Sequence, residues 1–400
     1  MRRNILERQD RASREKNNFF ARIDFVLLLI VAVLGIISVL LIYSAMTSNQ
    51  YIGDFGGRQI MFYIVGFILA LSIMFIPLQV MKQNIWFIYA AGVLSLLVLF
   101  VMPDTPLTPI INGAQSWYRI GPLSLQPSEF VKIIYILTMA YVISQHNQFK
   151  QSSDLVEDFK LLFKMALVTI LPIFFILSQN DLGTVLVFLA IIIGMVVVSG
   201  ISWWIIIPTL IVFVTVGLAT ILGILYRPDI IQNLLGVQSY QLERIYTWLR
   251  PYEYFREGGF QLANSLQAIG SGGLEGQGYG SGSIYIPENH TDFIFTIIGE
   301  EFGFIGSTIV ILILFVLMLH LARVAISADT TLASYFIIGY ISMLMFQVFQ
   351  NIGMTIQLVP ITGLPLPFIS YGGTALWSNM FAIGIILSIQ FYRMRYKTAK

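Results

Sequence analysis

The 400-residue chain has no cysteine, and only 11% of its residues are charged. The absence of cysteine excludes disulfides and thiolate metal sites. The histidines, His146, His290 and His320, are far apart in sequence and lack the spacing of a metal site. A soluble domain cannot cover its surface with so few charges, whereas a bilayer solvates apolar side chains directly. Because 57% of the residues are hydrophobic, the composition indicates a membrane protein.

Apolar segments of membrane-spanning length recur along the whole chain, and a spanning helix needs roughly 20 such residues. The first, from Phe25 to Ala45, is too long for the core of a signal peptide, so we expect an uncleaved span. The sequence predicts an all-α polytopic membrane protein with one ten-span domain over residues 24–392, a basic arm at 1–23 and a tail at 393–400. The expected spans are about 24–45, 58–77, 85–102, 129–146, 161–178, 182–200, 203–226, 292–320, 332–358 and 367–392.

The distribution of basic residues predicts the orientation in the membrane. Ten spans place both termini on one side, and cytoplasmic segments normally carry the excess of Lys and Arg. With the termini inside, the inner segments hold most of the 23 basic residues, and Lys132 falls within the fourth span. The outer segments hold Arg58, Arg119, Arg227, Arg244, Arg250 and Arg256. Both termini are therefore expected in the cytoplasm.

The longest connection is a large extracellular loop, residues 227–291, between spans 7 and 8. Loops of such length are usually functional or disordered, and this one is rich in aromatic residues and glycine. Residues 241–255 have the pattern of an amphipathic interfacial helix, and a short helical piece is expected at 260–269. A glycine run follows, and it has neither a nucleotide P-loop motif nor a βαβ context. Its backbone amides are suited to cradling a phosphate, and a merely flexible connection is the alternative.

Asp292 lies where the long loop meets the eighth span. Partial desolvation there raises the pKa of a carboxylate and makes it a better base. The alternative is a helix cap, in which Thr291 or Asp292 accepts hydrogen bonds from free backbone N–H groups.

Further charged residues lie within or beside the spans, where charge is costly and often functional. Glu129 and Lys132 have i, i+3 spacing, which favours a buried ion pair that holds the bundle together, with a role in the site as the alternative. Asp181 is expected to pair with Lys132, to cap the sixth span, or both. Glu300 and Glu301 cannot both face lipid, so at least one should face a polar cavity or a cation.

Residues 360–373 contain three prolines and end in Ser370-Tyr371-Gly372-Gly373. Broken helices in membranes are tolerated where they line a cavity. A cavity wall and a simple tight turn are equally compatible with this pattern.

Taken together, these motifs resemble the SEDS family of bacterial wall growth, whose branches are the RodA and FtsW proteins, over about residues 24–393. The sequences of residues 287–292 and of Asn351-Ile352-Gly353-Met354 are more similar to the RodA branch than to the FtsW branch. Asn180 stands where the family usually has proline. Gln115 stands where the family often has Lys or Arg, and the family often has a basic residue near Gln277, which bears on phosphate contacts. The matching segments are Asn112-Gly113-Ala114 through Trp117 and Arg119, Gln126-Pro127-Ser128-Glu129, Asp181-Leu182-Gly183-Thr184, Gly272-Gly273-Leu274, His290-Thr291-Asp292-Phe293-Ile294-Phe295, Pro360-Ile361-Thr362-Gly363 and Pro365 to Gly373.

The resemblance implies a peptidoglycan glycosyltransferase that acts on lipid II at the outer face of the plasma membrane, with Asp292 as the essential acidic residue. It implies a class B penicillin-binding protein as partner, together with other elongation-complex membrane proteins and no nucleic acid. A divalent cation, Mg²⁺ or Mn²⁺, is expected without assigned ligands, and no organic cofactor is expected. The candidate substrate or phosphate contacts are Arg119, Arg244, Gly272, Gly273, His290 and Thr291.

This chemistry is compatible with a single carboxylate. The implied reaction inverts an α-linked donor to a β-linked product. Inverting glycosidases need two carboxylates, because water must be activated and a poor leaving group protonated. A pyrophosphate leaves without a proton once its charge is stabilised, so one base is enough. Asp292 would deprotonate the acceptor hydroxyl, or hold a metal that does. A lipid II flippase and a non-catalytic scaffold are the alternatives.

Overall fold

The computed structural model describes residues 19–47, 53–110, 114–121, 123–150, 155–229, 232 and 239–397. Most of the basic arm, the motif residues Asn112 and Gly113, and residues 230–231 and 233–238 of the long loop lie outside the described residues.

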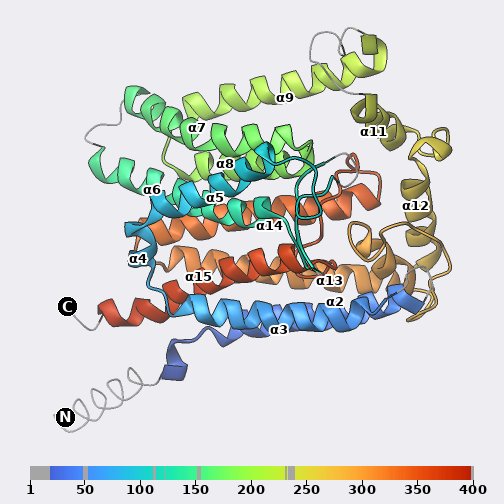
Figure 1. The fold of residues 1–400 in the computed structure, drawn as a ribbon, viewed down its shortest axis with the longest axis horizontal. Coiled ribbons are helices and arrows are strands. Elements are labelled where there is room, and N and C mark those ends of the chain that lie inside the picture. Colours follow the sequence, from blue (N-terminus) through green and yellow to red (C-terminus); the bar gives the residue numbers. More distant parts are fainter. Residues whose placement is uncertain are drawn as a thin grey trace.

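The described chain is a bundle of long helices (Figure 1). The only strands in this part of the chain are β1 and β2, which pair antiparallel in the loop before α6. The elements are η1 (Phe19–Arg22), α2 (Phe25–Thr47), α3 (Phe55–Met74), α4 (Leu78–Gln83), α5 (Ile85–Val101), β1 (Tyr118–Ile120), β2 (Leu123–Leu125), α6 (Pro127–Phe149), α7 (Leu155–Ser178), α8 (Leu182–Val198), α9 (Trp203–Tyr226), α11 (Ser239–Leu249), η2 (Phe255–Glu257), α12 (Phe260–Gly272), α13 (Ile294–Ile326), α14 (Thr331–Thr355) and α15 (Gly373–Lys397).

Eight of these helices are long and apolar enough to cross a membrane, which confirms a polytopic membrane protein. They are α2, α3, α6, α7, α9, α13, α14 and α15. The apolar helices α5 and α8 are shorter, with 17 residues each. Together the ten helices follow the order of the ten predicted segments, and the count of ten spans stays a prediction.

The predicted start of the last span at residue 367 is wrong, because α15 begins at Gly373. Pro365 and Pro367 lack a backbone N–H and restrict the residues before them, so the chain turns before the helix begins. Similarly, α11 ends at Leu249, earlier than the predicted residue 255, since Pro251 follows. In contrast, α12 continues to Gly272, beyond the predicted end at 269.

Both described ends of the chain lie at one end of the bundle, and α11 and α12 lie at the other (Figure 1). This arrangement agrees with an even number of crossings and with a long loop opposite the termini. Helices α6 and α15 lie in the centre of the bundle. In their apolar membrane-spanning stretches, 83% and 78% of the residues are buried. Helix α9 lies at the edge, and only 6% of the residues in its apolar stretch are buried.

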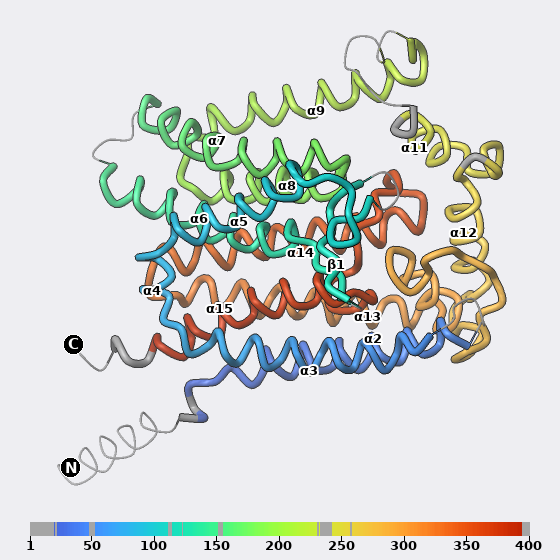
Figure 2. Tube along the Cα trace, viewed as in Figure 1, coloured from blue at the N-terminus to red at the C-terminus, as the bar shows by residue number. Residues whose placement is uncertain are grey.

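Helix α13 is broken at Gly303, whose φ of 62° and ψ of −156° are not helical. The break separates a short segment, 294–302, from the long remainder of the helix. The N–H groups of Phe304 and Ile305 donate instead to the carbonyl oxygens of Gly273 and Leu274, at 2.9 and 3.1 Å. Non-helical backbone at membrane depth requires such internal partners. The chain after α12 folds back against α13 at this point (Figure 2).

Candidate functional site

Asp292 lies two residues before the first residue of α13. The N-cap residue of α13 is Phe293 and neither Thr291 nor Asp292, and its side chain forms no capping hydrogen bond. The alternative of a helix cap by Thr291 or Asp292 is therefore wrong, and the Asp292 carboxylate is not used to satisfy the helix start.

The backbone around Asp292 is held from two sides. The side-chain amide of Asn351, on α14, donates to the carbonyl oxygen of Asp292 at 2.7 Å and to that of Leu364 at 2.8 Å. The carboxylate itself lies against Gly363, since a Cβ built there would be 3.1 Å from Asp292 Oδ2. Gly363 has a φ of 75°, which side chains rarely adopt, so glycine is required for both space and conformation.

Burial raises the pKa of Asp292 to about 7, and the nearby Glu288 carboxylate adds to this rise. The Arg244 guanidinium and the Thr291 hydroxyl act in the opposite direction. A carboxylate that is half ionised near neutral pH is well matched to accept a proton from a sugar hydroxyl. This environment is the kind that functional carboxylates have.

The residues beside Asp292 support it through their backbone. The Ser370 hydroxyl donates to the carbonyl oxygen of Thr291 at 2.6 Å and accepts the N–H of Leu366 at 2.8 Å. The N–H of Tyr371 donates to the carbonyl oxygen of His290 at 2.9 Å. The segment 360–373 is thus a turn, as one alternative proposed, and it also forms one wall of the site.

Two predicted contacts, His290 and Thr291, have structural partners within the protein. The His290 ring packs against the rings of Phe55 and Tyr371, with centroids at 4.9 and 5.4 Å. Burial lowers the pKa of His290, so the ring is neutral at pH 7. The Thr291 hydroxyl donates to the carbonyl oxygen of Glu288 at 3.0 Å.

Arg244 is the predicted cation that the structure brings closest to Asp292. Its Nη1 donates to the carbonyl oxygen of Ile361 at 3.3 Å, and its charge acts on the Asp292 carboxylate. Helix α11 is held in place by Trp248, whose indole N–H donates to the carbonyl oxygen of Gln357 at 2.9 Å. The amide of Gln357 donates back to the carbonyl oxygen of Trp248 at 2.8 Å.

Two other outer arginines differ in their relation to this site. Arg119 is exposed on β1, and no contact with Asp292 is present among the residues that the structure describes. Arg58 was not among the predicted site residues. Its guanidinium carbon lies 5.9 Å from the centroid of the Phe55 ring, which packs on His290. Its charge also acts on the Tyr371 hydroxyl. Arg58 is therefore a second cation near the rings that pack on His290.

The glycine run has partners within the protein. A Cβ at Gly272 would be 2.0 Å from the carbonyl oxygen of Gly299, so this residue packs directly on α13. The carbonyl oxygen of Gly273 accepts the N–H of Phe304 at 2.9 Å. Gly272 and Gly273 thus have packing roles, and their contact with phosphate stays a prediction.

The predicted ion pair between Glu129 and Lys132 is present at 2.7 Å, with Lys132 fully buried. The second oxygen of Glu129 accepts the hydroxyl of Ser378, on α15, at 3.3 Å. The pair therefore joins α6 to α15 in the centre of the bundle.

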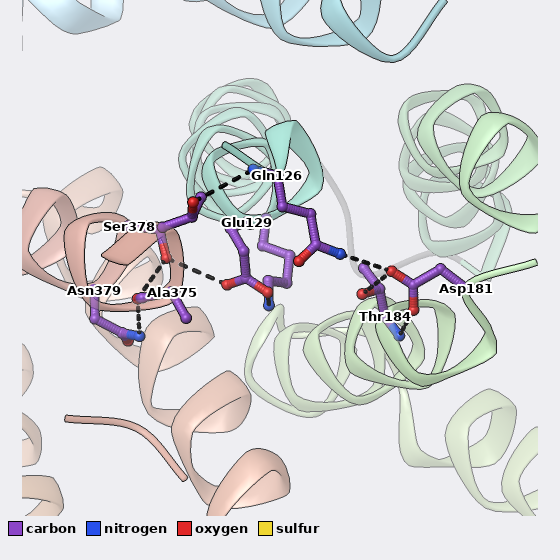
Figure 3. A network of polar contacts seen from close by, with 9 residues as sticks. Gln126, Glu129, Asp181, Thr184, Ala375, Ser378 and Asn379 are labelled. Atoms are coloured by element: carbon purple, nitrogen blue, oxygen red, sulfur yellow. Dashed lines mark hydrogen bonds and ion pairs between the residues drawn. The ribbon is translucent and has the colours of Figure 1, made fainter. Parts of the chain in front are cut away.

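Asp181 caps α8, as one alternative proposed. Its Oδ1 accepts the N–H of Thr184 at 3.0 Å, and its Oδ2 accepts the side-chain amide of Gln126 at 3.0 Å (Figure 3). No ion pair joins Asp181 to Lys132 in the described part of the chain, so this proposed pairing is wrong. The side-chain amide of Gln126 donates to Asp181 instead, and the charge of Lys132 is already neutralised by Glu129.

The described residues around Asp292 do not form a metal site of three or more ligating side chains. In the described ranges, no three His, Cys, Asp or Glu side chains converge in a way that could hold one. The nearest acidic neighbour, Glu288, turns its Oε2 toward the Thr291 hydroxyl at 3.2 Å. A divalent cation that arrives with a substrate pyrophosphate is a separate case and stays a prediction.

Comparison with known proteins gives a consistent pattern. The model of the FtsW/RodA/SpoVE cell cycle proteins matches residues 20–395. The chain is 34% identical to the stage V sporulation protein E of Bacillus subtilis, covering 92% of this chain and 97% of that protein. It is 30% identical to the peptidoglycan glycosyltransferase RodA of Treponema pallidum, with coverage of 92% and 97%.

A solved chain from a peptidoglycan synthase complex that coordinates polymerisation and crosslinking has a similar fold. Its TM-score is 0.75 at 26% identity, covering 94% of this chain and 99% of that one. Since the sporulation protein is at least as similar as the RodA protein, the closer resemblance to the RodA branch stays a prediction.

Proposed function

Because this chain belongs to the FtsW/RodA/SpoVE family of cell cycle proteins, we propose that it is a peptidoglycan glycosyltransferase that polymerises lipid II into β-1,4 glycan strands for cell elongation and shape. A relative that the chain covers almost completely carries the name of that activity. The observation in this chain that carries the proposal is Asp292, a carboxylate that does not cap its helix and has a pKa near 7.

Asp292 acts as the general base in this proposal. In its ionised form it takes the proton of the acceptor sugar 4-hydroxyl while that oxygen attacks the anomeric carbon of the donor sugar. The bond from the anomeric carbon to the lipid pyrophosphate breaks, and the electron pair leaves with the pyrophosphate. The configuration inverts once, from α to β. Asn351 and Gly363 fix the position of the base, because both hold its backbone or carboxylate.

The leaving pyrophosphate needs positive charge and not a proton. Arg244 and Arg58 supply cations from two helices, α11 and α3. Both are exposed, so a phosphate can reach them. This arrangement favours a donor that binds between α11 and the outer end of α3.

The proposed topology has ten spans, both termini in the cytoplasm and the site at the outer face of the plasma membrane. The common end of the two described termini and the opposite position of the 239–291 segment support it (Figure 1). The basic residues of the inner segments support the direction.

The proposed partner is a class B penicillin-binding protein, which cross-links the new strands, with other elongation-complex membrane proteins around it. The solved synthase complex that resembles this chain couples polymerisation to crosslinking. The chain covers 99% of the matching chain of that complex, which supports a partner of this kind.

The proposal is tested by purifying the protein with its partner, adding lipid II and measuring glycan polymer on gels. Asp292→Ala and Asp292→Asn should abolish polymerisation, whereas Glu275→Gln, an exposed carboxylate of the same outer loop, should not. Normal polymerisation by Asp292→Ala would overturn the proposal. Transfer of labelled lipid II across vesicles without any polymer from the wild-type complex would identify a flippase.

A further inference from the structure

The loop at 280–284 directs backbone N–H groups toward a buried carboxylate of α13. The N–H groups of Ser283 and Ile284 donate to Glu300 Oε1 at 3.0 and 3.4 Å. Glu300 is 4% exposed, so these bonds form away from solvent. Hydrogen bonds from successive amides are a recognised way to hold an anion.

The neighbouring carboxylate, Glu301, is connected to the same loop through α2. The hydroxyl of Ser44 donates to Glu301 Oε1, and the N–H of Gly280 donates to that hydroxyl oxygen at 3.2 Å. Both carboxylates converge on Gly282, where a Cβ would be 3.2 Å from Glu300 Oε2 and 3.5 Å from Glu301 Oε1. The loop therefore closes around the two side chains.

Neither Glu300 nor Glu301 forms an ion pair with a basic side chain among the described residues. A buried carboxylate without hydrogen bonds or a counter-charge is strongly unfavourable. The loop amides donate to Glu300 Oε1 and the Ser44 hydroxyl donates to Glu301 Oε1, whereas the buried Glu301 Oε2 has no hydrogen-bond partner among the described residues. The group that these loop amides bind is thus the protein's own Glu300 carboxylate.

The whole glycine-rich loop, 273–284, of which 280–284 is the last part, also spans the break in α13. The N–H groups of Gln277 and Gly278 donate to the backbone carbonyl oxygens of Glu300 and Glu301 at 2.9 and 3.0 Å. With the bonds from Phe304 and Ile305 on the far side of Gly303, the loop holds both sides of the break. The short helical segment 294–302 is therefore fixed at its end by the loop.

Asp292 and Phe293 directly precede that short segment. Phe293 packs in a small cluster with Ala268, Ile286 and Met354, against which Ile284 also packs. The loop that Glu300 holds thus continues directly into the residues that precede Asp292. The two ends of the segment 294–302 are set by two contacts, the loop at one end and Asn351 at the other.

We propose that Glu300, assisted by Glu301, is a positioning residue for Asp292: it anchors the 280–284 loop by its backbone amides and so keeps the Asp292 carboxylate in reach of the acceptor hydroxyl. This inference rests on the proposed function, in which Asp292 is the base. It requires an acceptor oxygen at position 300 and does not require a metal ion there.

The test compares Glu300→Ala, Glu300→Gln and Glu275→Ala, the last an exposed outer-loop control, in the purified complex. Glutamine keeps an oxygen that accepts the Ser283 and Ile284 amides, and alanine does not. Glu300→Ala should lower kcat about 10- to 100-fold with little change in KM for lipid II, since a misplaced reacting group costs rate more than binding. Glu300→Gln should stay within about 3-fold of wild type, because its amide oxygen still accepts the Ser283 and Ile284 N–H groups.

Amide hydrogen exchange of residues 276–286 gives a readout independent of activity. Exchange should accelerate about 10-fold or more in Glu300→Ala, stay near wild type in Glu300→Gln, and not change in the control. Ser44→Ala, which removes only the link to Glu301, is the milder second variant if Glu300→Ala does not fold. It should accelerate exchange around Gly280 and lower kcat a few-fold.

Wild-type exchange and kcat in both Glu300→Ala and Ser44→Ala would overturn the inference. So would a loss in Glu300→Gln equal to that in Glu300→Ala, accompanied by Mg²⁺-dependent thermal stability in the wild type alone, because that result requires a cation bound by charge. Failure of the proposed function is distinguished by Asp292→Ala, which would then polymerise normally whatever the exchange data show.

Discussion

The side-chain amide of Asn351 donates to the backbone carbonyl oxygens of both Asp292 and Leu364, at 2.7 and 2.8 Å. Asn351 is fully buried and lies on α14, whereas its partners lie before α13 and before α15. One side chain therefore joins three parts of the bundle at the base of the site. Its neighbour Gln350 donates to the carbonyl oxygen of Pro360 at 2.8 Å and holds the same segment.

Replacing Asn351 by alanine should reduce catalysis far more than it reduces folding. Two buried carbonyl oxygens lose their donor, and Asp292 loses the contact that fixes its backbone. We expect kcat to fall about 10- to 100-fold. Adding Asp292→Ala to this variant should still abolish the remaining activity. Lipid II polymerisation by the purified complex measures this. Ser342→Ala, which removes a hydroxyl bonded within α14, is the control and should retain activity. Equal rates in the two variants would contradict the role of Asn351.

The polymerisation rate should depend on pH with a midpoint near the pKa of Asp292, about 7. A general base must be ionised, so activity rises with pH through this value and levels off above it. The Glu288 carboxylate raises the pKa of Asp292 and the Arg244 guanidinium lowers it. The midpoint should therefore move down in Glu288→Gln and up in Arg244→Gln. Rate–pH profiles at saturating lipid II check both directions, and shifts of the same sign would refute this assignment.

The stability of the protein should also depend on the ionisation of Asp292, but it should fall as pH rises, whereas activity rises. The pKa of Asp292 is about 7 in the folded protein, against an ordinary value of 3.8. Between these values the folded state binds a proton that the unfolded state does not, so this group's contribution to stability falls as pH rises. Asp292→Asn has no such group. Its apparent Tm relative to wild type should increase from about pH 4 to pH 7 and stay constant above. Fluorescence melting in detergent measures it, with Glu275→Gln as a variant whose difference should not follow this course.

Much of the fold and part of the site could be predicted from the sequence, because the information was local. Apolar runs of membrane length give the helices, and the i, i+3 spacing of Glu129 and Lys132 gives their ion pair. Asp292 is recognisable as a charge at the junction of a loop and a span. Each of these inferences needs only neighbouring residues along the chain.

The features that the sequence did not reveal depend on residues far apart in it. Asn351 contacts Asp292 across 59 positions, so its spacing carries no signal beyond a polar residue within a span. Gly303 looks like any glycine in an apolar helix, and only the approach of Gly273 and Leu274 shows that α13 is broken there. Asp181 was expected to reach Lys132, and the choice of Gln126 as its partner depends on how α6 and α8 pack.

The ion pair of Glu129 and Lys132 should behave as a coupled unit on which Asp181 has little influence. Breaking a buried pair by removing one partner leaves an unpaired charge and typically costs about 3–5 kcal/mol, whereas replacing both partners costs less. Lys132→Met and Glu129→Gln should each lower the apparent Tm strongly, and the double variant should be more stable than Lys132→Met alone. In the second cycle, Asp181→Asn replaces Glu129→Gln, and asparagine keeps an acceptor for the Thr184 N–H. The effects of Lys132→Met and Asp181→Asn on stability should be nearly additive, because Asp181 bonds Gln126 and Thr184 and not Lys132. Thermal melting of the four variants in each cycle measures both couplings. A coupling of Lys132 to Asp181 as large as that to Glu129 would show that the lysine shares its charge between the two carboxylates.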